Sequence, residues 1–419
     1  MTALWVFLNY FVFIYPLYMS FIWIVGALIF FFHWEWKPID QKIDIYPFFS
    51  IVIPAHNEEG AIKETVNNLK DLNYPIYEVI VVNDGSTDRT AEILDQMVSE
   101  DSEHLRVIHL SPNGGKSRAL NMGSLFSRGE LLLFIDADCL LDKNALKYFA
   151  WHFVNFPRVG AVTGNPRIRN RTTLLGKIQV GEYSSIIGLI KRAQRVLGKV
   201  FTVSGVINAF RKGAFCTCGF FDSDTVTEDI DMTWKLEKQF WDVRFETRAI
   251  GWILTPETLS GLWAQRVRWA QGAMQVARKH VVDILHFKQL QFWPVYIEYV
   301  ISIIWGCSLG LLFFSWLIGY ILYFFGIIGK PIQPFIPPAW AGSILALMCI
   351  VQFMVSLYID SHYEHKSFLK NYFWVIWYPF FYWAVIASTV FVSLFNVFIR
   401  KGGVSVRWKS PDRGLQTLK

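Results

Sequence analysis

ELLLFIDAD, residues 130–138, is an apolar run that ends in two aspartates one residue apart. Similar short runs, rich in β-branched or apolar residues, occur on either side of it at 49–54, 78–84, 105–110 and 159–164. Stretches with helical character separate these runs, and the alternation predicts a mostly parallel sheet with helices on both faces. In such sheets, ligands bind at the carboxyl ends of the strands. We therefore expect a Rossmann-like nucleotide-binding α/β domain over residues 48–255.

Long windows without charged residues flank this domain. They cover residues 1–34, 299–329, 331–359 and 371–399, and each is long enough to cross roughly 30 Å of bilayer hydrocarbon. Hydrophobic residues make up 53% of the chain and aromatic residues 17%, which is typical of a membrane protein. The first window lacks the basic start and the short apolar core of a signal peptide, so we expect it to remain as a transmembrane segment.

The basic residues predict the orientation of the chain. Lys37 and Lys42 follow the first window, which favours an α/β domain on the cytoplasmic side. Three further spans would place the basic tail, residues 400–419, outside, whereas its lysines and arginines favour the cytoplasm. The predicted number of membrane spans can therefore be wrong by one. Pro379 can interrupt the last window, and residues 299–329 can form a hairpin.

Other classes of protein are disfavoured by composition and motif. The five cysteines form no CxxC pair, and no histidine spacing suits zinc, as in a reduced cytosolic domain. The net charge of +6 is concentrated next to the membrane windows, so nucleic acid is not an expected partner. Neither a complete Walker A motif nor a GxGxxG motif occurs.

Asp136 and Asp138 directly follow the apolar strand, where a ligand of the sheet would bind. Two neighbouring carboxylates can hold Mg²⁺ or Mn²⁺, which neutralises a departing diphosphate. The same spacing recurs at 222/224 and 229/231, but neither pair follows a strand directly. A solvated turn is the alternative. We expect Asp136 and Asp138 to be metal ligands, with Asp138 also counted among the catalytic residues.

Three residues near strand ends are candidates for binding a nucleotide donor. Asp84 can accept a hydrogen bond from a uracil imide or a ribose hydroxyl, although Asp-Gly-Ser is equally typical of a turn. Glu58 either binds the ribose or caps a helix that is expected to begin at Asn57. Lys116 follows two glycines and can reach phosphates or the base, although a lone lysine is more often a solvated charge.

Transfer of a sugar requires a base that removes the proton of the acceptor hydroxyl. Asp229, which follows Thr227 and Glu228, is the candidate. The alternative is a capping box at the start of a helix, with Thr227 as the N-cap residue. Both interpretations can hold together, because a helix start is a rigid place from which to project a carboxylate.

Residues 256–290 are expected to form amphipathic helices on the cytoplasmic membrane surface. They contain Gln265, Arg268 and Trp269. Arg268 can neutralise a leaving diphosphate, and Trp269 offers a flat apolar face to an acceptor sugar. The alternative is that tryptophan and arginine are simply common at a bilayer interface.

Four motifs share the order and spacing found in processive family 2 glycosyltransferases, such as the cellulose, chitin and hyaluronan synthases, and the chain resembles this group. The motifs are Asp84, Asp136-x-Asp138, Thr227-Glu228-Asp229 and Gln265-x-x-Arg268-Trp269. Within the group, residues 163–194, 255–272 and 410–414 are similar to the poly-β-1,6-N-acetyl-D-glucosamine synthases of bacterial biofilms. The similarity extends over nearly the whole chain.

The resemblance implies a GT-A fold in the cytosolic domain and a role for each motif. Glu58 and Asp84 would bind the uridine, and Asp136 and Asp138 the diphosphate and the metal ion. Asp229 would be the base. The remaining substrate-binding residues implied at the diphosphate and the acceptor end are Lys116, Gln265, Arg268 and Trp269. Residues 291–399 would form transmembrane helices along the path of the glycan.

The resemblance also implies a donor, UDP-N-acetylglucosamine, and an acceptor, the growing polymer. It implies a multi-pass protein of the bacterial cytoplasmic membrane with its catalytic domain in the cytoplasm, coupled export of the polymer, and a small membrane accessory subunit. Three alternatives remain. They are a synthase of the hyaluronan, chitin or cellulose type, a transferase that adds one sugar to a lipid carrier, and an export channel with a degenerate transferase domain.

Overall fold

The computed structural model describes residues 3–37, 42–101, 103–330, 340–364, 366–375 and 378–398. The basic tail expected at 400–419 lies outside these residues, as does most of the proline-containing stretch between the second and third windows. All five strands expected from the sequence are present within them.

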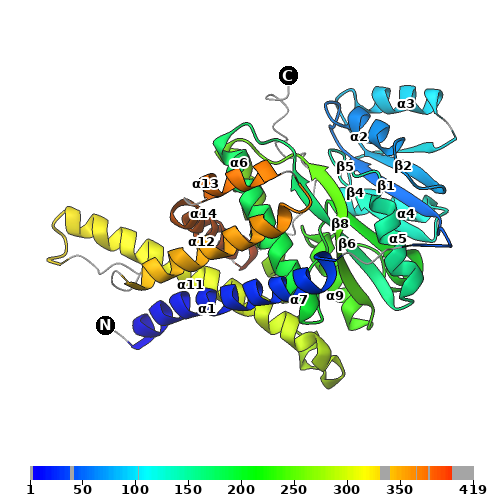
Figure 1. Ribbon diagram of the computed structural model, residues 1–419. Coiled ribbons are helices and arrows are strands. Elements are labelled where there is room, and N and C mark those ends of the chain that lie inside the picture. The colour runs from blue at the N-terminus through cyan, green and yellow to red at the C-terminus, as the bar shows by residue number, and fades with distance from the viewer. Residues whose placement is uncertain are drawn as a thin grey trace.

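The α/β domain contains one eight-stranded mixed sheet in the order β3-β2-β1-β4-β7-β6-β8-β5 (Figure 1). The strands are β1 (Phe49–Ala55), β2 (Tyr77–Asp84), β3 (Leu105–Leu110), β4 (Leu131–Ile135), β5 (Leu140–Leu141), β6 (Val159–Ile168), β7 (Ile207–Arg211) and β8 (Asp242–Ile253). Strands β3, β2, β1 and β4 are mutually parallel. Strand β7 is antiparallel to both β4 and β6, and β5 is antiparallel to β8. The sheet is therefore parallel in one half, as predicted, and mixed in the other.

Helices cover both faces of the sheet because successive strand residues point to opposite sides. Ile51 and Ile53 of β1 pack in one core with α2 (Ile62–Leu69), α3 (Thr90–Glu100) and α5 (Ala145–Asn155). Val52, between them, packs in the second core with α4 (Lys116–Phe126), α8 (Lys212–Thr217) and α9 (Glu228–Lys238). Every residue of β1 is buried, which explains its uninterrupted apolar run.

Helices α1 (Ala3–Phe30), α11 (Trp293–Phe324) and α12 (Trp340–Asp360) extend away from the sheet on one side (Figure 1). A short π-helical segment, η1 (Phe31–Glu35), continues α1. Within the described residues, three helical stretches are long and apolar enough to cross a membrane, Ala3–Glu35, Gln289–Phe324 and Gly342–Asp360. They match the first three charge-free windows.

The fourth window is described in two parts, because residues 376 and 377 within it lie outside the described residues. It contains α13 (Tyr372–Val375) and α14 (Tyr378–Phe398), and the apolar stretch Trp383–Val397 lies within α14. Pro379 lies in the first turn of α14, where a proline is tolerated. Whether the window is interrupted near Pro379, as the sequence suggested, stays a prediction.

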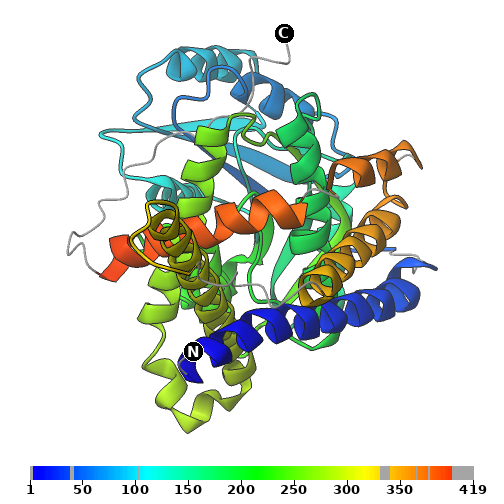
Figure 2. The same cartoon turned by 90° about the vertical axis from the view of Figure 1, so that its left-hand side faces the viewer.

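A long helical passage connects the α/β domain to the membrane helices. It consists of α6 (Leu174–Glu182), the π-helical segment η2 (Tyr183–Leu189) and α7 (Ile190–Val196). Helix α7 packs on α1, and η2 packs on α12, so the passage lies between the sheet and two spans (Figure 2). Helix α10 (Leu259–Lys279) packs against α14 and occupies part of the region predicted to hold amphipathic interfacial helices.

Buried ion pairs tie these parts together. Arg192 of α7 donates through Nε to Glu35 Oε1 at 2.8 Å, and its Nη2 lies 3.1 Å from Asp360 Oδ1. Arg167 of β6 donates through Nη1 to Asp360 Oδ2 at 2.5 Å. The four side chains are at most 3% exposed. Ion pairs thus fix the ends of α1 and α12 to the α/β domain.

Candidate active site

The loop between β3 and α4 is held by Asp84 at the end of β2. The Asp84 carboxylate is completely buried and accepts hydrogen bonds from the backbone N–H of Gly114 at 3.1 Å and of Gly115 at 2.7 Å. Gly115 has a φ of 95°, which is strained for any other residue, and Lys116 opens α4 directly after it. Asp84 therefore positions Lys116. The predicted contact of Asp84 with uridine stays a prediction.

Lys116 joins the ends of several elements. Its Nζ lies 2.6 Å from Asp136 Oδ1, 3.2 Å from the carbonyl oxygen of Gly205 and 3.6 Å from Glu228 Oε1. Burial opposes ionisation of the ammonium, but attraction by Asp136 and Glu228 outweighs it and raises the pKa of Lys116. A fixed positive charge therefore lies where a diphosphate could be bound.

Asp136 and Asp138 project from the turn after β4, as predicted from the apolar run. Asp136 is slightly exposed, whereas Asp138 is buried and accepts a hydrogen bond from the backbone N–H of Leu254, just after β8, at 3.2 Å. Cys139 N–H donates to the Asp136 carbonyl and tightens the turn. One carboxylate thus faces Lys116, and the other is fixed to the segment that follows β8.

The fit of a divalent metal depends on this pair of carboxylates. Among the described residues, no group of three or more His, Cys, Asp or Glu side chains could hold an ion without further ligands. Mg²⁺ is typically bound through one or two carboxylates together with substrate phosphates. Asp136 and Asp138 fit such a shared site, in which the substrate completes the coordination.

Glu58 lies beyond the end of β1, beside the loop that follows β2. It is buried, and its backbone N–H donates to Thr90 Oγ1 at 2.9 Å. The helix expected to begin at Asn57 instead begins at Ile62, so that capping prediction is wrong. Asn57 has a φ of 57°, and its side-chain oxygen accepts from the Thr87 N–H at 2.8 Å. The asparagine thus joins two loops at the ligand edge of the sheet.

Asp229 lies in the first turn of α9. The helix begins after Thr227, as predicted, but the Thr227 side chain makes no capping hydrogen bond, so the predicted capping box is not formed. Burial, and then repulsion by Glu228, raises the pKa of Asp229 to about 6, while Lys116 and Lys191 oppose the rise. Asp229 is therefore largely ionised near pH 7 and has a pKa suited to accepting a proton.

Gly205 allows the loop before β7 to approach this carboxylate. A Cβ at position 205 would lie 2.9 Å from Asp229 Oδ2, so a larger residue would displace one of the two. The carbonyl of the same glycine accepts from Lys116. Gly205 therefore lies between the candidate base and the candidate phosphate-binding lysine, which the sequence alone did not indicate.

Helix α10 contributes Gln265, Arg268 and Trp269. Arg268 is exposed, and its charge acts on the pKa of Lys116, so the two cations are near each other. The side-chain oxygen of Gln265 is buried and has no hydrogen-bond partner among the described residues. Burying a hydrogen-bond acceptor without a partner costs free energy. This is the state expected of an oxygen that accepts a hydrogen bond from a substrate. The ring of Trp269 is partly buried and is covered by the Arg266 guanidinium.

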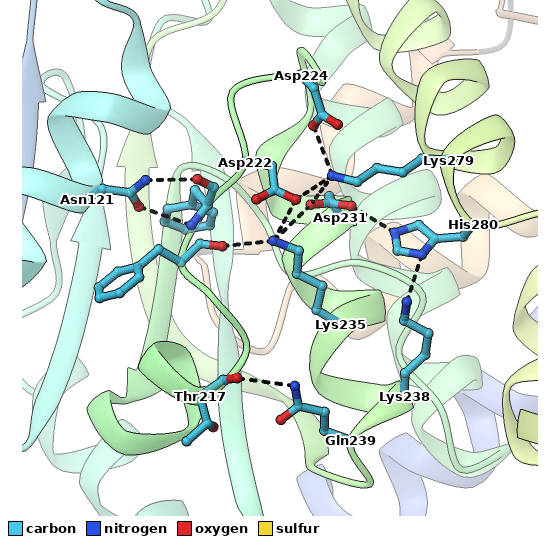
Figure 3. Close-up of polar contacts among 12 residues, drawn as sticks. Asn121, Thr217, Asp222, Asp224, Asp231, Lys235, Lys238, Gln239, Lys279 and His280 are labelled. Carbon is cyan, nitrogen blue, oxygen red and sulfur yellow. Dashed lines mark hydrogen bonds and ion pairs between the residues drawn. The ribbon is translucent and has the colours of Figure 1, made fainter. Parts of the chain in front are cut away.

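A network of charges joins the second half of α10 to α9 (Figure 3). Lys279 pairs with Asp222, with Asp224 at 2.9 Å and with Asp231 at 3.2 Å. His280 Nε2 lies 2.8 Å from Asp231 Oδ1. Asp231 is completely buried two residues after Asp229. The second and third Asp-x-Asp patterns of the sequence thus help to fix the two helices, and neither forms a metal site in the described chain.

Four residues near the predicted site were not proposed from the sequence. Glu228 belongs to a motif and Arg266 has the helical spacing of Leu262 and Trp269, but the sequence predicts no role for either of them, nor for Glu182 and Lys191. Lys191 is buried, donates to Thr163 Oγ1 at 3.4 Å, and has a pKa that burial lowers to about 7 against the attraction of Asp229. A lysine in a helical stretch gives no local sign of burial, so no sequence pattern could have found it.

Comparisons with known proteins place the chain in a family. The profile described as Glycosyl transferase family 2 matches residues 50–218. Poly-beta-1,6-N-acetyl-D-glucosamine synthase from Staphylococcus epidermidis is 37% identical over 96% of this chain and 98% of its own length. The protein of the same name from Staphylococcus aureus is 38% identical over 97% of this chain and 98% of its own.

A solved structure confirms the fold. A mannosyltransferase from Pyrobaculum calidifontis, determined with GDP-mannose and Mn²⁺, superposes with a TM-score of 0.56 at 18% identity, over 94% of this chain and all of that one. Because the identity is low, this likeness supports the GT-A type of fold and nothing finer. With the family profile and the full-length similarity to the staphylococcal proteins, the chain belongs to the poly-β-1,6-N-acetyl-D-glucosamine synthases of glycosyl transferase family 2.

Proposed function

We propose that the protein transfers N-acetylglucosamine from UDP-N-acetylglucosamine to a growing β-1,6-linked chain and passes that chain across the bacterial cytoplasmic membrane for a biofilm matrix. The convergence of Lys116, Asp136 and Glu228 beside Asp229 is the observation that carries this proposal. It combines cationic and acidic groups for a diphosphate with a base of suitable pKa. The names of the staphylococcal relatives support the choice of sugar and linkage.

On the donor side, Asp136 and Asp138 would hold Mg²⁺ or Mn²⁺, which neutralises the charge that develops on the leaving UDP. Lys116 and Arg268 contribute positive charge at the same place. Glu58 and Asp84 bind or frame the uridine at the ends of β1 and β2. The donor is thereby oriented with its anomeric carbon towards α9.

On the acceptor side, Asp229 takes the proton from the 6-hydroxyl group of the terminal sugar. The hydroxyl oxygen then forms a bond to the anomeric carbon as the bond from that carbon to the diphosphate oxygen breaks. Attack from the face opposite the leaving group converts an α-linked donor into a β-linked product. Gln265 and Trp269 bind the terminal sugar, the first by a hydrogen bond and the second by its ring face.

The membrane helices serve this reaction by providing a path for the polymer. A polar glycan cannot dissolve in hydrocarbon and requires a passage lined by protein. Helices α11 and α14 pack against α10, and α1 packs against α11 and α12, so these four helices are the elements that would line it. We infer a catalytic domain in the cytoplasm, a multi-pass arrangement, and a small membrane accessory subunit.

The test is polymer synthesis by the full-length protein in lipid nanodiscs with Mg²⁺ and UDP-N-acetylglucosamine. Asp229→Asn, which preserves size and removes the base, is expected to bind UDP normally and to lower the rate of transfer by at least about 10²-fold. Polymer synthesis by this variant at the wild-type rate would refute the assignment of the base. A single sugar on a lipid carrier, in place of a β-1,6-linked polymer, would refute the proposed reaction.

A further inference from the structure

Arg266 lies within the Gln265-x-x-Arg268-Trp269 motif but has a different environment from Arg268. Its guanidinium carbon lies 4.1 Å from the centroid of the Trp269 ring. Its Nη2 donates to Glu182 Oε2 at 2.6 Å. The side chains of Arg266 and Glu182 are 5% and 6% exposed, whereas Arg268 is exposed. Arg266 is thus a buried cation, held by Glu182, beside the Trp269 ring on which the acceptor sugar is proposed to stack.

The contact follows from the geometry of α10. Residues three positions apart lie on neighbouring parts of one helix face, which brings the Arg266 and Trp269 side chains together. A planar guanidinium over an indole face is attracted by the ring, and more strongly where water is excluded. With one face of the indole covered, a sugar can stack only on the opposite face.

The anchor of Arg266 belongs to a distinctive part of the fold. Glu182 is the last residue of α6 and directly precedes the π-helical segment η2. Such segments are rare and are found frequently at functional sites. The helix is held in place at the preceding residue, since a Cβ at Gly181 would lie 2.2 Å from Val375 Cγ1 of α13. The carboxylate that holds Arg266 therefore has a fixed position.

We propose that Arg266, held by Glu182, is a positioning residue that fixes the Trp269 indole as the platform for the acceptor end of the polymer. The inference rests on the proposed function, in which Trp269 stacks on that sugar. A buried ion pair is weak evidence for stability, because desolvation of the two charges offsets much of their attraction. The position of this ion pair against the Trp269 ring points instead to a role in orienting that ring.

The role separates acceptor binding from donor binding. Lys116, Asp136 and Asp138 lie on α4 and after β4, and none of them is in the pair between α6 and α10. Loosening the indole should therefore weaken retention of the growing chain and leave UDP binding unchanged. In a polymerase that keeps its product bound, weaker retention appears as shorter polymers.

The experiment compares Arg266→Ala, Arg266→Lys, Glu182→Gln and Trp269→Ala in the full-length protein in nanodiscs, with Arg278→Ala on the exposed side of α10 as the control. Three quantities are measured, namely the Kd for UDP with Mg²⁺, the KM for added N-acetylglucosamine oligosaccharides and the length distribution of the polymer. Arg266→Ala and Glu182→Gln are expected to raise the acceptor KM about tenfold, the change that 1.4 kcal/mol corresponds to. They should also shorten the polymer, with an unchanged UDP Kd.

Arg266→Lys keeps the buried charge and can still pair with Glu182, but it lacks the planar group that covers the indole. It is the decisive variant if the alanine variant does not fold, and it is expected to show the same shift to a smaller extent. Wild-type acceptor KM and polymer length in Arg266→Lys and Glu182→Gln, together with a defect in Trp269→Ala, would overturn the role of Arg266 alone. A wild-type acceptor KM in Trp269→Ala would instead overturn the platform itself.

Discussion

Glu237 of α9 is a buried carboxylate to which the proposed reaction assigns no role. It is 1% exposed, and neither of its side-chain oxygens has a hydrogen-bond partner among the described residues. Burial raises its pKa from 4.5 to about 8, with Asp242 adding to the rise and Lys199 opposing it. The folded protein therefore keeps this proton at neutral pH, where the unfolded chain has lost it.

This difference predicts the pH dependence of stability. Between about pH 4.5 and pH 8 the folded state binds one more proton than the unfolded state at this site, so the free energy of unfolding falls as the pH rises. Glu237→Gln removes the titration, and its Tm relative to wild type should rise steadily from pH 5 to pH 8. The exposed Glu92→Gln on α3 is the control. A Tm difference for Glu237→Gln that does not change with pH would contradict the prediction.

Single residues also show where sequence reasoning succeeds and where it stops. The positions of Asp136, Asp138 and Asp229 in the fold could be predicted because each lies at a recognisable strand end or helix start, whereas their roles stay predictions. The partnership of Arg266 with Glu182 could not, because the two residues are separated by 84 positions and only tertiary packing brings them together. Local patterns give the type of a side chain and the element that holds it, and contacts between distant elements are missing from them.

Among the elements, α9 and α10 approach each other closely near the candidate base. Gly272 of α10 lies against Thr227, the residue before α9, and a Cβ at position 272 would lie 2.4 Å from both Thr227 Oγ1 and Cγ2. Thr227 is short and β-branched, so it has little freedom to move aside. The glycine therefore sets the distance between the two helices that contribute Asp229 and Trp269.

Gly272→Ala is expected to reverse the usual effect of this substitution. In an exposed helix interior the change stabilises by about 1 kcal/mol, because alanine is the better helix former. Here the added methyl group should push α10 from α9, lower the Tm and reduce polymer synthesis by roughly 10- to 100-fold through misplacement of reacting groups. Gly213→Ala on α8, where no atom lies within 4 Å of the added Cβ, is the matched control. Equal Tm and activity in the two variants would rule out this role of Gly272.

The strands differ in how clearly their sequences predict them. β1, β2, β3, β4 and β6 are apolar runs, and all five were predicted. β7 has five residues and β5 only two, which is too short for a clear pattern. β8 is not a continuous apolar run, because charged residues alternate with other residues over its first part and lie along one side of the strand. The antiparallel insertion of β7 between β4 and β6 depends on pairing between distant residues, which periodicity does not encode.

In the whole molecule, the catalytic domain and the membrane helices share buried charge. Arg192 is completely buried between Glu35 and Asp360, at the ends of α1 and α12. Both ends lie against the α/β domain on the side from which the spans extend (Figure 1). Arg192 thus joins the two parts at a position distant in sequence from both carboxylates.

Arg192→Met should uncouple these parts. It leaves two buried carboxylates with one cation fewer, and loss of one partner from a buried ion pair typically costs about 3–5 kcal/mol. The measurement is thermal unfolding of the purified protein in detergent, followed by UDP binding. Arg195→Met, which removes a partly exposed arginine 3.5 Å from Asp242, should cost no more than about 1 kcal/mol. Similar losses in the two variants would show that the buried cluster has no special part in holding the molecule together.

The same ion cluster has a consequence for how the protein is made. Glu35 leaves the ribosome 157 residues before its partner Arg192, and Asp360, the partner of Arg167, follows that arginine by 193 residues. During synthesis the α/β domain therefore passes through a stage in which Arg167 has no carboxylate from Asp360 to pair with. The charge balance of this buried cluster is complete only after α12 has been made and packed against the domain.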